Sequence, residues 1–190
     1  MEPEGVDAIR IDRQQGVYEA VKYLNETGRK HIAYVGFTTG RPHDPLFYAT
    51  GTRLQGYVRA MSELGKHTMI IPLPLEIGNY EGGKGAIEPF LKLSPQPDAV
   101  QVFADDMAMG FLAALHEHGI RVPQDVAVVG FNGCPYGQLA WPPLTTVAQP
   151  LSAVGERAAE VLLDKLEGKP APVGGWSESL PTSLLLRETA

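Results

Sequence analysis

The chain has 190 residues, of which 44% are hydrophobic and 20% are charged, a composition typical of globular and not of disordered proteins. Its net charge of −6 excludes a broad basic surface for nucleic acid, and its single cysteine, Cys134, excludes an intramolecular disulfide. No apolar run approaches the ~20 residues that span a bilayer, and the acidic N-terminal sequence shows no signal peptide, so we expect a cytoplasmic protein without membrane contact.

Strands and helices alternate from the beginning of the chain. An extended piece at 8–11 precedes a helix that the Asp12 carboxylate caps and that ends at Gly28. The apolar residues of this helix recur at the spacing of one helical face: Val17, Ala20, Val21 and Leu24. A strand follows at 32–35, and we expect a long loop from Phe37 to Gly51, a length that often marks a functional loop.

The same alternation continues through the middle of the chain. We expect a helix from Arg53 to Leu64, a strand at 68–71 and a loop at 77–80. The apolar face of the first of these holds Leu54, Tyr57, Val58 and Met61. A helix around Ile87, Phe90 and Leu91 follows, then a strand at 98–103, then a helix from Asp105 to about His118 with Gly119 as its stop.

The last third opens with a valine-rich strand from Val126 to Gly130, which is typical of a strand buried on both faces. An extended segment at 144–147, a helix at 151–166, a linker at 168–172 and a final extended segment at 180–187 follow. The inward face of the 151–166 helix holds Val154, Ala158, Val161 and Leu162. This alternation predicts an α/β fold, with a doubly wound, mostly parallel sheet flanked by helices.

The stretch from Val126 to Gln149 carries a distinctive order of features. A strand ends in Val-Gly-Phe-Asn, a polar loop follows, and Pro142 and Pro143 precede Leu-Thr-Thr-Val-Ala-Gln. This order closely resembles the lactose/galactose repressor family of sugar-responsive transcription regulators. Further similar stretches are Arg53-Leu54-Gln55-Gly56-Tyr57, Asp105-Asp106-Met107-Ala108-Met109-Gly110 and Val122-Pro123-Gln124-Asp125-Val126, so the resemblance covers essentially residues 8 to 190.

The resemblance implies the effector-binding region of such a regulator, with a fold like that of type I periplasmic binding proteins and without the DNA-binding headpiece. It implies four segments. Residues 1–30 are a fragment of the N-terminal lobe and crossover, and residues 31–146 are the C-terminal effector-binding lobe. Residues 147–168 return to the N-terminal lobe, and residues 169–190 are a linker and a final strand of the C-terminal lobe. We therefore expect the apolar faces of the helices containing Val17 and Val154 to lack a sheet to pack on.

Four polar residues are predicted to converge on one ligand crevice: Arg53, Asp105, Asn132 and Gln149. Asp105 and Asn132 each follow a strand, and the carboxyl ends of parallel strands share one edge of a sheet. Gln149 follows the Leu-Thr-Thr segment, where the resemblance places the crossing between lobes. Asn132 stands where most members of the family have Asp, and Ala104 where Asn is common. An amide at 132 can donate and accept hydrogen bonds but cannot give a charge-assisted bond.

Several of these residues can also be interpreted as having a purely structural role. Asp105 and Asp106 could suggest a metal site or a phosphoacceptor, but an N-cap that favours the helix dipole is the simpler account. Arg53 at the predicted helix start is disfavoured by the dipole, which leaves a ligand contact or a solvated side chain. Asn132 before Gly133 could simply form a turn. Cys134 has no activating partner nearby, and His116 and His118 do not share a helical face, so we expect no metal and no cofactor.

The leading functional hypothesis is an effector-binding part of a cytoplasmic transcription regulator, with a sugar or nucleoside between two lobes. A solute-binding receptor of the same fold is the alternative. An enzyme is disfavoured because the chain has no Gly-x-Ser-x-Gly, P-loop or HExxH motif. The resemblance further implies a homodimer through the helix after Asp105 and the loop near Leu139 and Trp141. We expect DNA contact only through a headpiece outside this chain.

Overall fold

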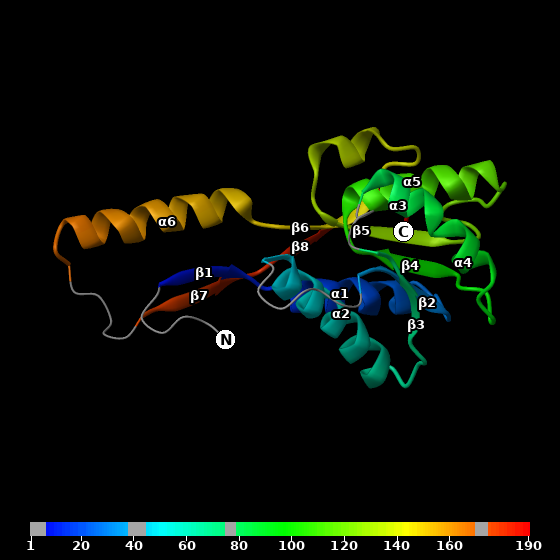
Figure 1. Ribbon diagram of the computed structural model, residues 1–190, viewed down its shortest axis with the longest axis horizontal. Coiled ribbons are helices and arrows are strands. Elements are labelled where there is room, and N and C mark those ends of the chain that lie inside the picture. The colour runs from blue at the N-terminus through cyan, green and yellow to red at the C-terminus, as the bar shows by residue number, and fades with distance from the viewer. Residues whose placement is uncertain (1–6, 38–44, 75–78, 170–174) are drawn as a thin grey trace.

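The computed structural model describes residues 7–37, 45–74, 79–169 and 175–190, with the backbone alone at 45–50. The described strands are β1 Ala8–Ile11, β2 Ile32–Gly36, β3 Met69–Pro72, β4 Ala99–Val102, β5 Ala127–Asn132, β6 Thr145–Ala148, β7 Ser177–Leu180 and β8 Ser183–Leu185. The described helices are α1 Arg13–Glu26, α2 Pro45–Glu63, α3 Tyr80–Gly85, α4 Ile87–Leu91, α5 Asp105–Glu117 and α6 Leu151–Leu166, with a 3-10 helix, η2, at Pro135–Leu139. They form a layered body and an arm that projects from it (Figure 1).

A six-stranded sheet in the order β3-β2-β4-β5-β6-β8 forms the centre of the body. Every neighbouring pair is parallel except β6 and β8, which are antiparallel. Helices α1 and α2 lie on one face of this sheet, and α3, α4 and α5 lie on the other (Figure 1). The predicted doubly wound, mostly parallel α/β fold is therefore confirmed.

Helix α1 forms as the sequence predicts but packs differently from our expectation. The Asp12 carboxylate accepts a 2.9 Å hydrogen bond from the backbone N–H of Gln15, and Gly28, with φ of 93°, follows the C-terminal turn. The predicted apolar face, including Val17 and Leu24, is buried in the body core. The expectation that this face lacks a sheet is wrong for α1, because the face covers the six-stranded sheet. The division of the chain into four lobe segments stays a prediction.

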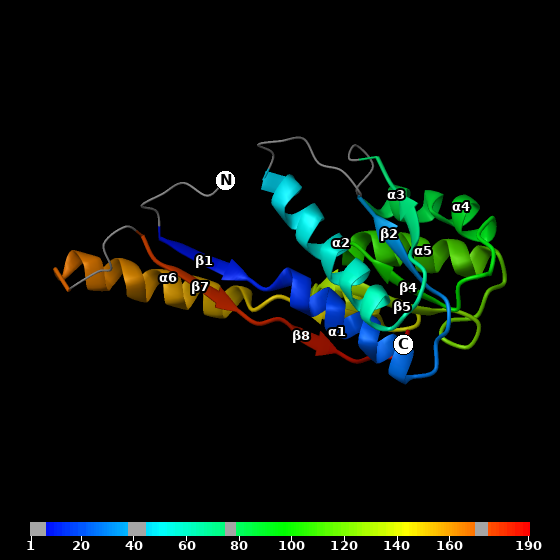
Figure 2. The same ribbon diagram turned by 90° about the horizontal axis from the view of Figure 1, so that it is seen from below.

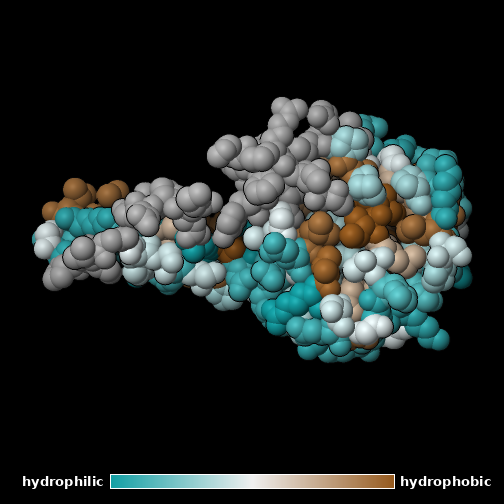
Figure 3. Space-filling model, turned by 60° about the horizontal axis from the view of Figure 1, so that its bottom comes forward, coloured by the Kyte–Doolittle hydropathy of each residue, from teal (hydrophilic) through white to brown (hydrophobic). Residues whose placement is uncertain are grey.

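The arm consists of β1, β7 and α6 and extends away from the body (Figures 1 and 2). Strands β1 and β7 pair in parallel, with Ala8 opposite Ser177, as a separate two-stranded sheet. The predicted inward residues of α6 line a groove of about 380 Å³ that also includes Ile9 and Trp176. No residue of α6 is buried, and hydrophobic surface appears at the far end of the arm (Figure 3). The apolar face of α6 therefore lies against β1 of the two-stranded sheet but is only partly covered, so the expectation of a face without a sheet fits α6 only in part.

Helix α2 begins at Pro45, eight residues earlier than the sequence predicts. Proline favours the first turn of a helix, where its missing N–H is not needed, which accounts for a start at Pro45. Arg53 consequently lies more than two turns inside the helix, and the argument from the helix dipole does not apply to it. The buried face holds Arg53, Tyr57 and Met61, whereas Val58 is 41% exposed. The part of the predicted long loop at 38–44 lies outside the described residues.

One further predicted helix differs in the structure, and two predicted connecting segments lie largely outside the described residues. The helix expected around Ile87 is divided into α3 and α4, with Ala86 between them. Much of the expected loop at 77–80 and of the expected linker at 168–172 lies outside the described residues.

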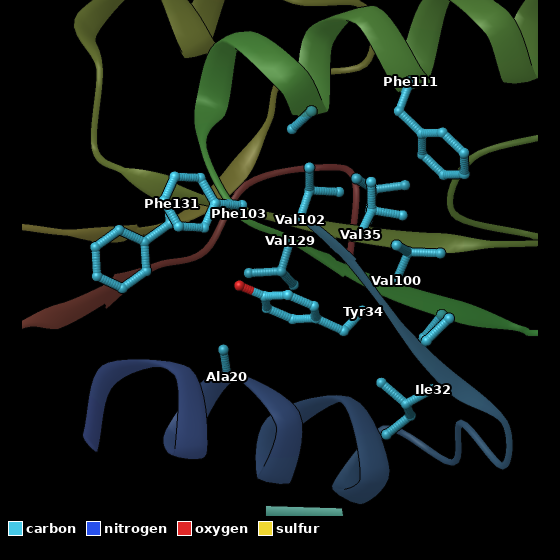
Figure 4. Close-up of a cluster of buried hydrophobic side chains, with 14 of the residues drawn as sticks. Ala20, Ile32, Tyr34, Val35, Val100, Val102, Phe103, Phe111, Val129 and Phe131 are labelled. Atoms are coloured by element: carbon cyan, nitrogen blue, oxygen red, sulfur yellow. The ribbon is translucent and has the colours of Figure 1, made fainter. Parts of the chain in front are cut away.

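The core on the α1 side of the sheet combines aliphatic and aromatic side chains. Tyr34 of β2 points its ring across the core toward the side where Phe103 and Phe131 lie (Figure 4). Its hydroxyl is buried without a hydrogen-bond partner among the described residues, and burial raises the pKa of Tyr34. The aromatic rings near the ends of β4 and β5 therefore border the sheet edge from which the candidate site is built.

Candidate functional site

Three of the four predicted site residues are joined directly by hydrogen bonds. Arg53 comes from α2, Asn132 ends β5, and Gln149 follows β6. The Arg53 Nη2 atom donates a 3.2 Å bond to Asn132 Oδ1, and Gln149 Nε2 donates a 2.9 Å bond to the same oxygen. Because β5 and β6 are adjacent parallel strands, these residues meet at the carboxyl edge of the sheet.

Arg53 is held in a largely apolar environment and is only 6% exposed. Its guanidinium carbon lies 4.2 Å from the ring centre of Phe103 and 4.0 Å from that of Phe131. The Nη1 atom donates a 2.6 Å hydrogen bond to the Phe103 carbonyl oxygen. Burial lowers the pKa of Arg53 to about 10, so the group keeps its positive charge at neutral pH. The aromatic faces stabilise this charge by cation–π attraction.

Asn132 adopts a backbone conformation that side-chain-bearing residues rarely take, with φ of 128°. Strained backbone of this kind costs on the order of 1–3 kcal/mol and persists where the surrounding structure enforces it. Here the Asn132 side chain is fixed by Arg53 and Gln149, while the next residue, Gly133, lies against Ala148 with φ of 74°. The interpretation of Asn132 as a turn residue before Gly133 is therefore compatible with its place in the polar cluster.

Asp105 lies close to this cluster but is 0% exposed, and its two oxygens are engaged within the protein. Oδ1 accepts a 2.6 Å bond from the Thr146 hydroxyl, and Oδ2 accepts a 2.7 Å bond from the Cys134 backbone N–H. Gly130 makes room, because a Cβ at that position would collide with Asp105 Oδ1. The expected cap is wrong, since Ala104 is the N-cap residue of α5 and Asp105 follows it inside the helix.

The thiol of Cys134 and the imidazole of His118, both singled out in the sequence, lie in structural surroundings. Burial raises the pKa of the Cys134 thiol, which keeps it protonated at neutral pH. The His118 Nδ1 atom lies 2.8 Å from the Ala114 carbonyl oxygen, within its own helix. Among the described residues, no group of three or more His, Cys, Asp or Glu side chains could hold a metal ion.

Sequence reasoning missed three residues that shape the site. In the sequence, Phe103 and Phe131 are recognisable only as the ends of apolar strands. No neighbouring residue indicates that both rings flank Arg53 of α2. Thr146 lies in the Leu-Thr-Thr run, and its complete burial between the Asp105 carboxylate and the Gly133 N–H makes it a structural link. The pair of threonines at the start of this strand could indicate a structural role for their hydroxyl groups, but it does not indicate which residues those hydroxyl groups contact.

The doubly wound, mostly parallel fold is that of a periplasmic binding protein-like domain. Residues 21–190 match the family model described as a periplasmic binding protein-like domain, and the chain belongs to this family. It is 35% identical over 181 residues to the transcriptional repressor CytR of Escherichia coli strain K12, covering 94% of this chain and 50% of the repressor. The chain thus spans about half the length of that relative.

Solved structures of similar regulators contain bound sugars. A LacI family regulator from Enterococcus faecalis V583 with bound ribose superimposes with a TM-score of 0.78 at 27% identity, covering 96% of this chain and 62% of the other. The complex of the transcriptional regulator CelR with cellobiose gives a TM-score of 0.80 at 32% identity, covering 97% and 54% of the two chains. Among the described residues, no helix is both long and apolar enough to cross a membrane.

Proposed function

We propose that this chain is the effector-binding part of a cytoplasmic transcription regulator, that it is not an enzyme, and that its effector is a small polar molecule such as a sugar or a nucleoside. The observation that carries the proposal is the cluster of Arg53, Asn132 and Gln149 at the carboxyl edge of the sheet. Crevices at this edge are the usual ligand sites of open α/β sheets. The sugar complexes of similar regulators support the same class of ligand.

The cluster combines a residue of the body with a residue of the connection to the arm, and an effector would have to control the relative orientation of these two parts. Asn132 belongs to the body, and Gln149 lies between β6 of the body and α6 of the arm. A ligand that bonds to both amides binds one orientation of the arm better than others. Such differential affinity shifts the population of orientations, which is the physical basis of effector control. Asp105 acts as a positioning residue, because it fixes the loop after β5 through Cys134.

The proposal includes a homodimer formed through the body. Trp141 is 89% exposed and Leu139 is 79% exposed, both on the loop predicted to contact a partner. Trp141 also lines a hollow of about 360 Å³ next to Leu112 and His116 of α5. Large exposed apolar side chains beside a hollow are typical of protein interfaces, where aromatic anchors fill pockets. DNA contact would come from a segment outside this chain.

The test begins with a thermal-shift screen of sugars and nucleosides on the 190-residue chain, followed by calorimetry. Arg53→Ala should weaken binding of the best ligand about 10- to 150-fold, the effect of losing a hydrogen bond to a charged group. Arg59→Ala is the matched control, because Arg59 lies on the same helix but pairs with Glu63 at 2.9 Å on the surface. Equal affinity of wild type and folded Arg53→Ala would remove Arg53 from the site. Ligand binding that none of Arg53, Asn132 and Gln149 affects would remove the site.

A further inference from the structure

The positive charge of Arg53 has no carboxylate in contact with it among the described residues. Its hydrogen bonds go to the Phe103 carbonyl oxygen and the Asn132 amide oxygen, both neutral acceptors. Its Nε atom is buried without any partner in the described part of the chain. A guanidinium carries five N–H donors, so most of its donor capacity is not used by these two bonds. Buried charges are normally paired, because an unpaired charge forfeits its hydration.

The two acidic residues whose charges act on Arg53, Asp105 and Asp106, do not supply this partner. Both oxygens of Asp105 accept bonds from Thr146 and Cys134, and Asp106 Oδ1 accepts a 2.9 Å bond from the backbone N–H of Met107. Neither carboxylate forms an ion pair with Arg53 within 4.0 Å in the described structure. Both favour the charged form of Arg53 from a distance, but burial is the larger effect and lowers its pKa.

The hydrogen bonds around Asn132 fix which groups the cluster offers to a ligand. Arginine only donates, so the Asn132 atom facing Arg53 must be the oxygen Oδ1. The Gln149 atom that contacts the same oxygen must then be the donor Nε2. The groups left for a ligand are the Asn132 NH₂ donor, the remaining Arg53 donors and the Gln149 oxygen. Asn132 and Gln149 are both partly exposed, so a ligand that reaches them is next to the guanidinium.

We propose that the effector is a polyhydroxylated molecule carrying one anionic group, a phosphate or a carboxylate, which becomes the counter-ion of Arg53. The inference rests on the proposed function and narrows its ligand class. A carboxylate at position 132 would occupy Arg53 and present only acceptors, which suits the hydroxyl donors of a neutral sugar. The amide that this chain has at 132 leaves the charge of Arg53 without a counter-ion among the described residues and adds an NH₂ donor to the groups that the cluster offers a ligand, beside the Gln149 oxygen.

The test compares matched ligand pairs that differ only in the anionic group, measured by calorimetry on the full 190-residue chain. The pairs are ribose 5-phosphate with ribose, and glucuronate with glucose, at equal ionic strength. We expect the anionic member of at least one pair to bind about 10- to 150-fold more tightly than the neutral member, as a charge-assisted bond to a guanidinium requires. The pair that shows the preference distinguishes a phosphate from a carboxylate.

Two variants separate this explanation from a general preference for anions. Asn132→Asp supplies an internal counter-ion for Arg53 and should abolish the preference for the anionic member, with the fold retained by circular dichroism. Arg59→Gln removes a surface guanidinium of the same helix and should leave the preference unchanged. A preference that survives in Asn132→Asp, or that disappears in Arg59→Gln, would contradict the proposal.

The remaining outcomes distinguish a failure of the anionic-effector proposal from a failure of the proposed effector-binding function. Equal or tighter binding of the neutral members would overturn the anionic effector while leaving the proposed effector-binding function in place. Inorganic phosphate that binds as tightly as ribose 5-phosphate would overturn it as well, because the polyhydroxyl part would then contribute nothing. Failure of every sugar, sugar phosphate, sugar acid and nucleoside to bind would count against the proposed function itself.

Discussion

The hydroxyl of Thr146 donates a 2.6 Å hydrogen bond to Oδ1 of Asp105, and both residues are completely buried. The bond joins the first residue of α5 to the second residue of β6, 41 positions further along the chain. The other Asp105 oxygen holds the backbone N–H of Cys134 in the loop after β5. Asp105 thus fixes three segments behind the candidate site.

Asp105→Ala should destabilise the chain by about 1–3 kcal/mol for each buried partner it leaves without a bond, the Thr146 hydroxyl and the Cys134 N–H. Asp105→Asn should cost clearly less, because its Oδ1 can accept from Cys134 while the Thr146 hydroxyl rotates to accept from its Nδ2. Urea denaturation of both variants measures the difference. Equal losses would show that the lost charge, and not the unpaired groups, determines the effect.

Gly130→Ala tests the space behind the same carboxylate. A Cβ there would collide with Asp105 Oδ1 and lie 3.0 Å from Leu144 Cδ2, so we expect a loss of about 1–3 kcal/mol, as for other overpacked cores. Gly155→Ala in α6 is the control, because a Cβ at 155 meets no atom within 4 Å. Replacing glycine in a helix should leave stability unchanged or raise it by up to about 1 kcal/mol. A harmless Gly130→Ala would show that Asp105 can move away.

The Arg121 guanidinium holds the pKa of the Asp125 carboxyl at about 2, below its ordinary 3.8. Because the pKa is lower in the folded chain, the pair contributes stability above about pH 4 and loses that contribution as the pH falls through about 2. An NMR titration of the Asp125 carboxyl carbon measures the midpoint directly. Arg121→Gln should move it toward 3.8, whereas the distant Arg59→Gln should not. A midpoint near 3.8 in the wild type would rule out the ion pair in solution.

Trp141→Arg tests the proposed homodimer. Burying an aromatic anchor in an interface is commonly worth 2 kcal/mol or more, so this variant should weaken self-association by roughly 30-fold or more. Analytical ultracentrifugation measures the change. Leu162→Arg is the control, an exposed apolar residue on the arm instead of the body. A wild-type chain that is strictly monomeric at concentrations on the order of tens of micromolar would contradict the dimer.

The strands of the sheet could be predicted from the sequence because their signal is local. The run of valines in β5 and the short apolar runs of β2 and β4 are each bounded by turn residues, and the structure buries them on both faces. Helix α1 could also be predicted from the sequence, because its cap and its apolar face lie within one segment. Its packing partner was not, because which sheet an amphipathic face covers depends on contacts between distant parts of the chain.

The site illustrates the same limit. The shared position of strand ends placed Asp105 and Asn132 at one edge of the sheet, and the resemblance placed Gln149 there. The structure joins Asn132 and Gln149 to Arg53, as predicted, although Arg53 comes from inside α2 and not from its start. Periodicity predicted the buried face of α2 as Leu54, Tyr57, Val58 and Met61, which is right for Tyr57 and Met61 but leaves out Arg53, because a charged residue is expected to be exposed. The burial of Arg53 depends on Phe103 and Phe131, which lie 50 and 78 positions away. No local pattern encodes that arrangement. Ligand binding by the cluster stays a prediction.

The most direct test of effector binding at this site is an NMR titration of the ¹⁵N-labelled chain with the tightest ligand from the screen, observing the side-chain NH₂ signals of Asn132 and Gln149. Both groups lie where the ligand should bond, and Gln149 Nε2 already donates to Asn132 Oδ1. We predict that both signals shift together and reach their end points at the saturation found by calorimetry. Signals of both side chains that stay unchanged while the ligand saturates the chain would contradict the account.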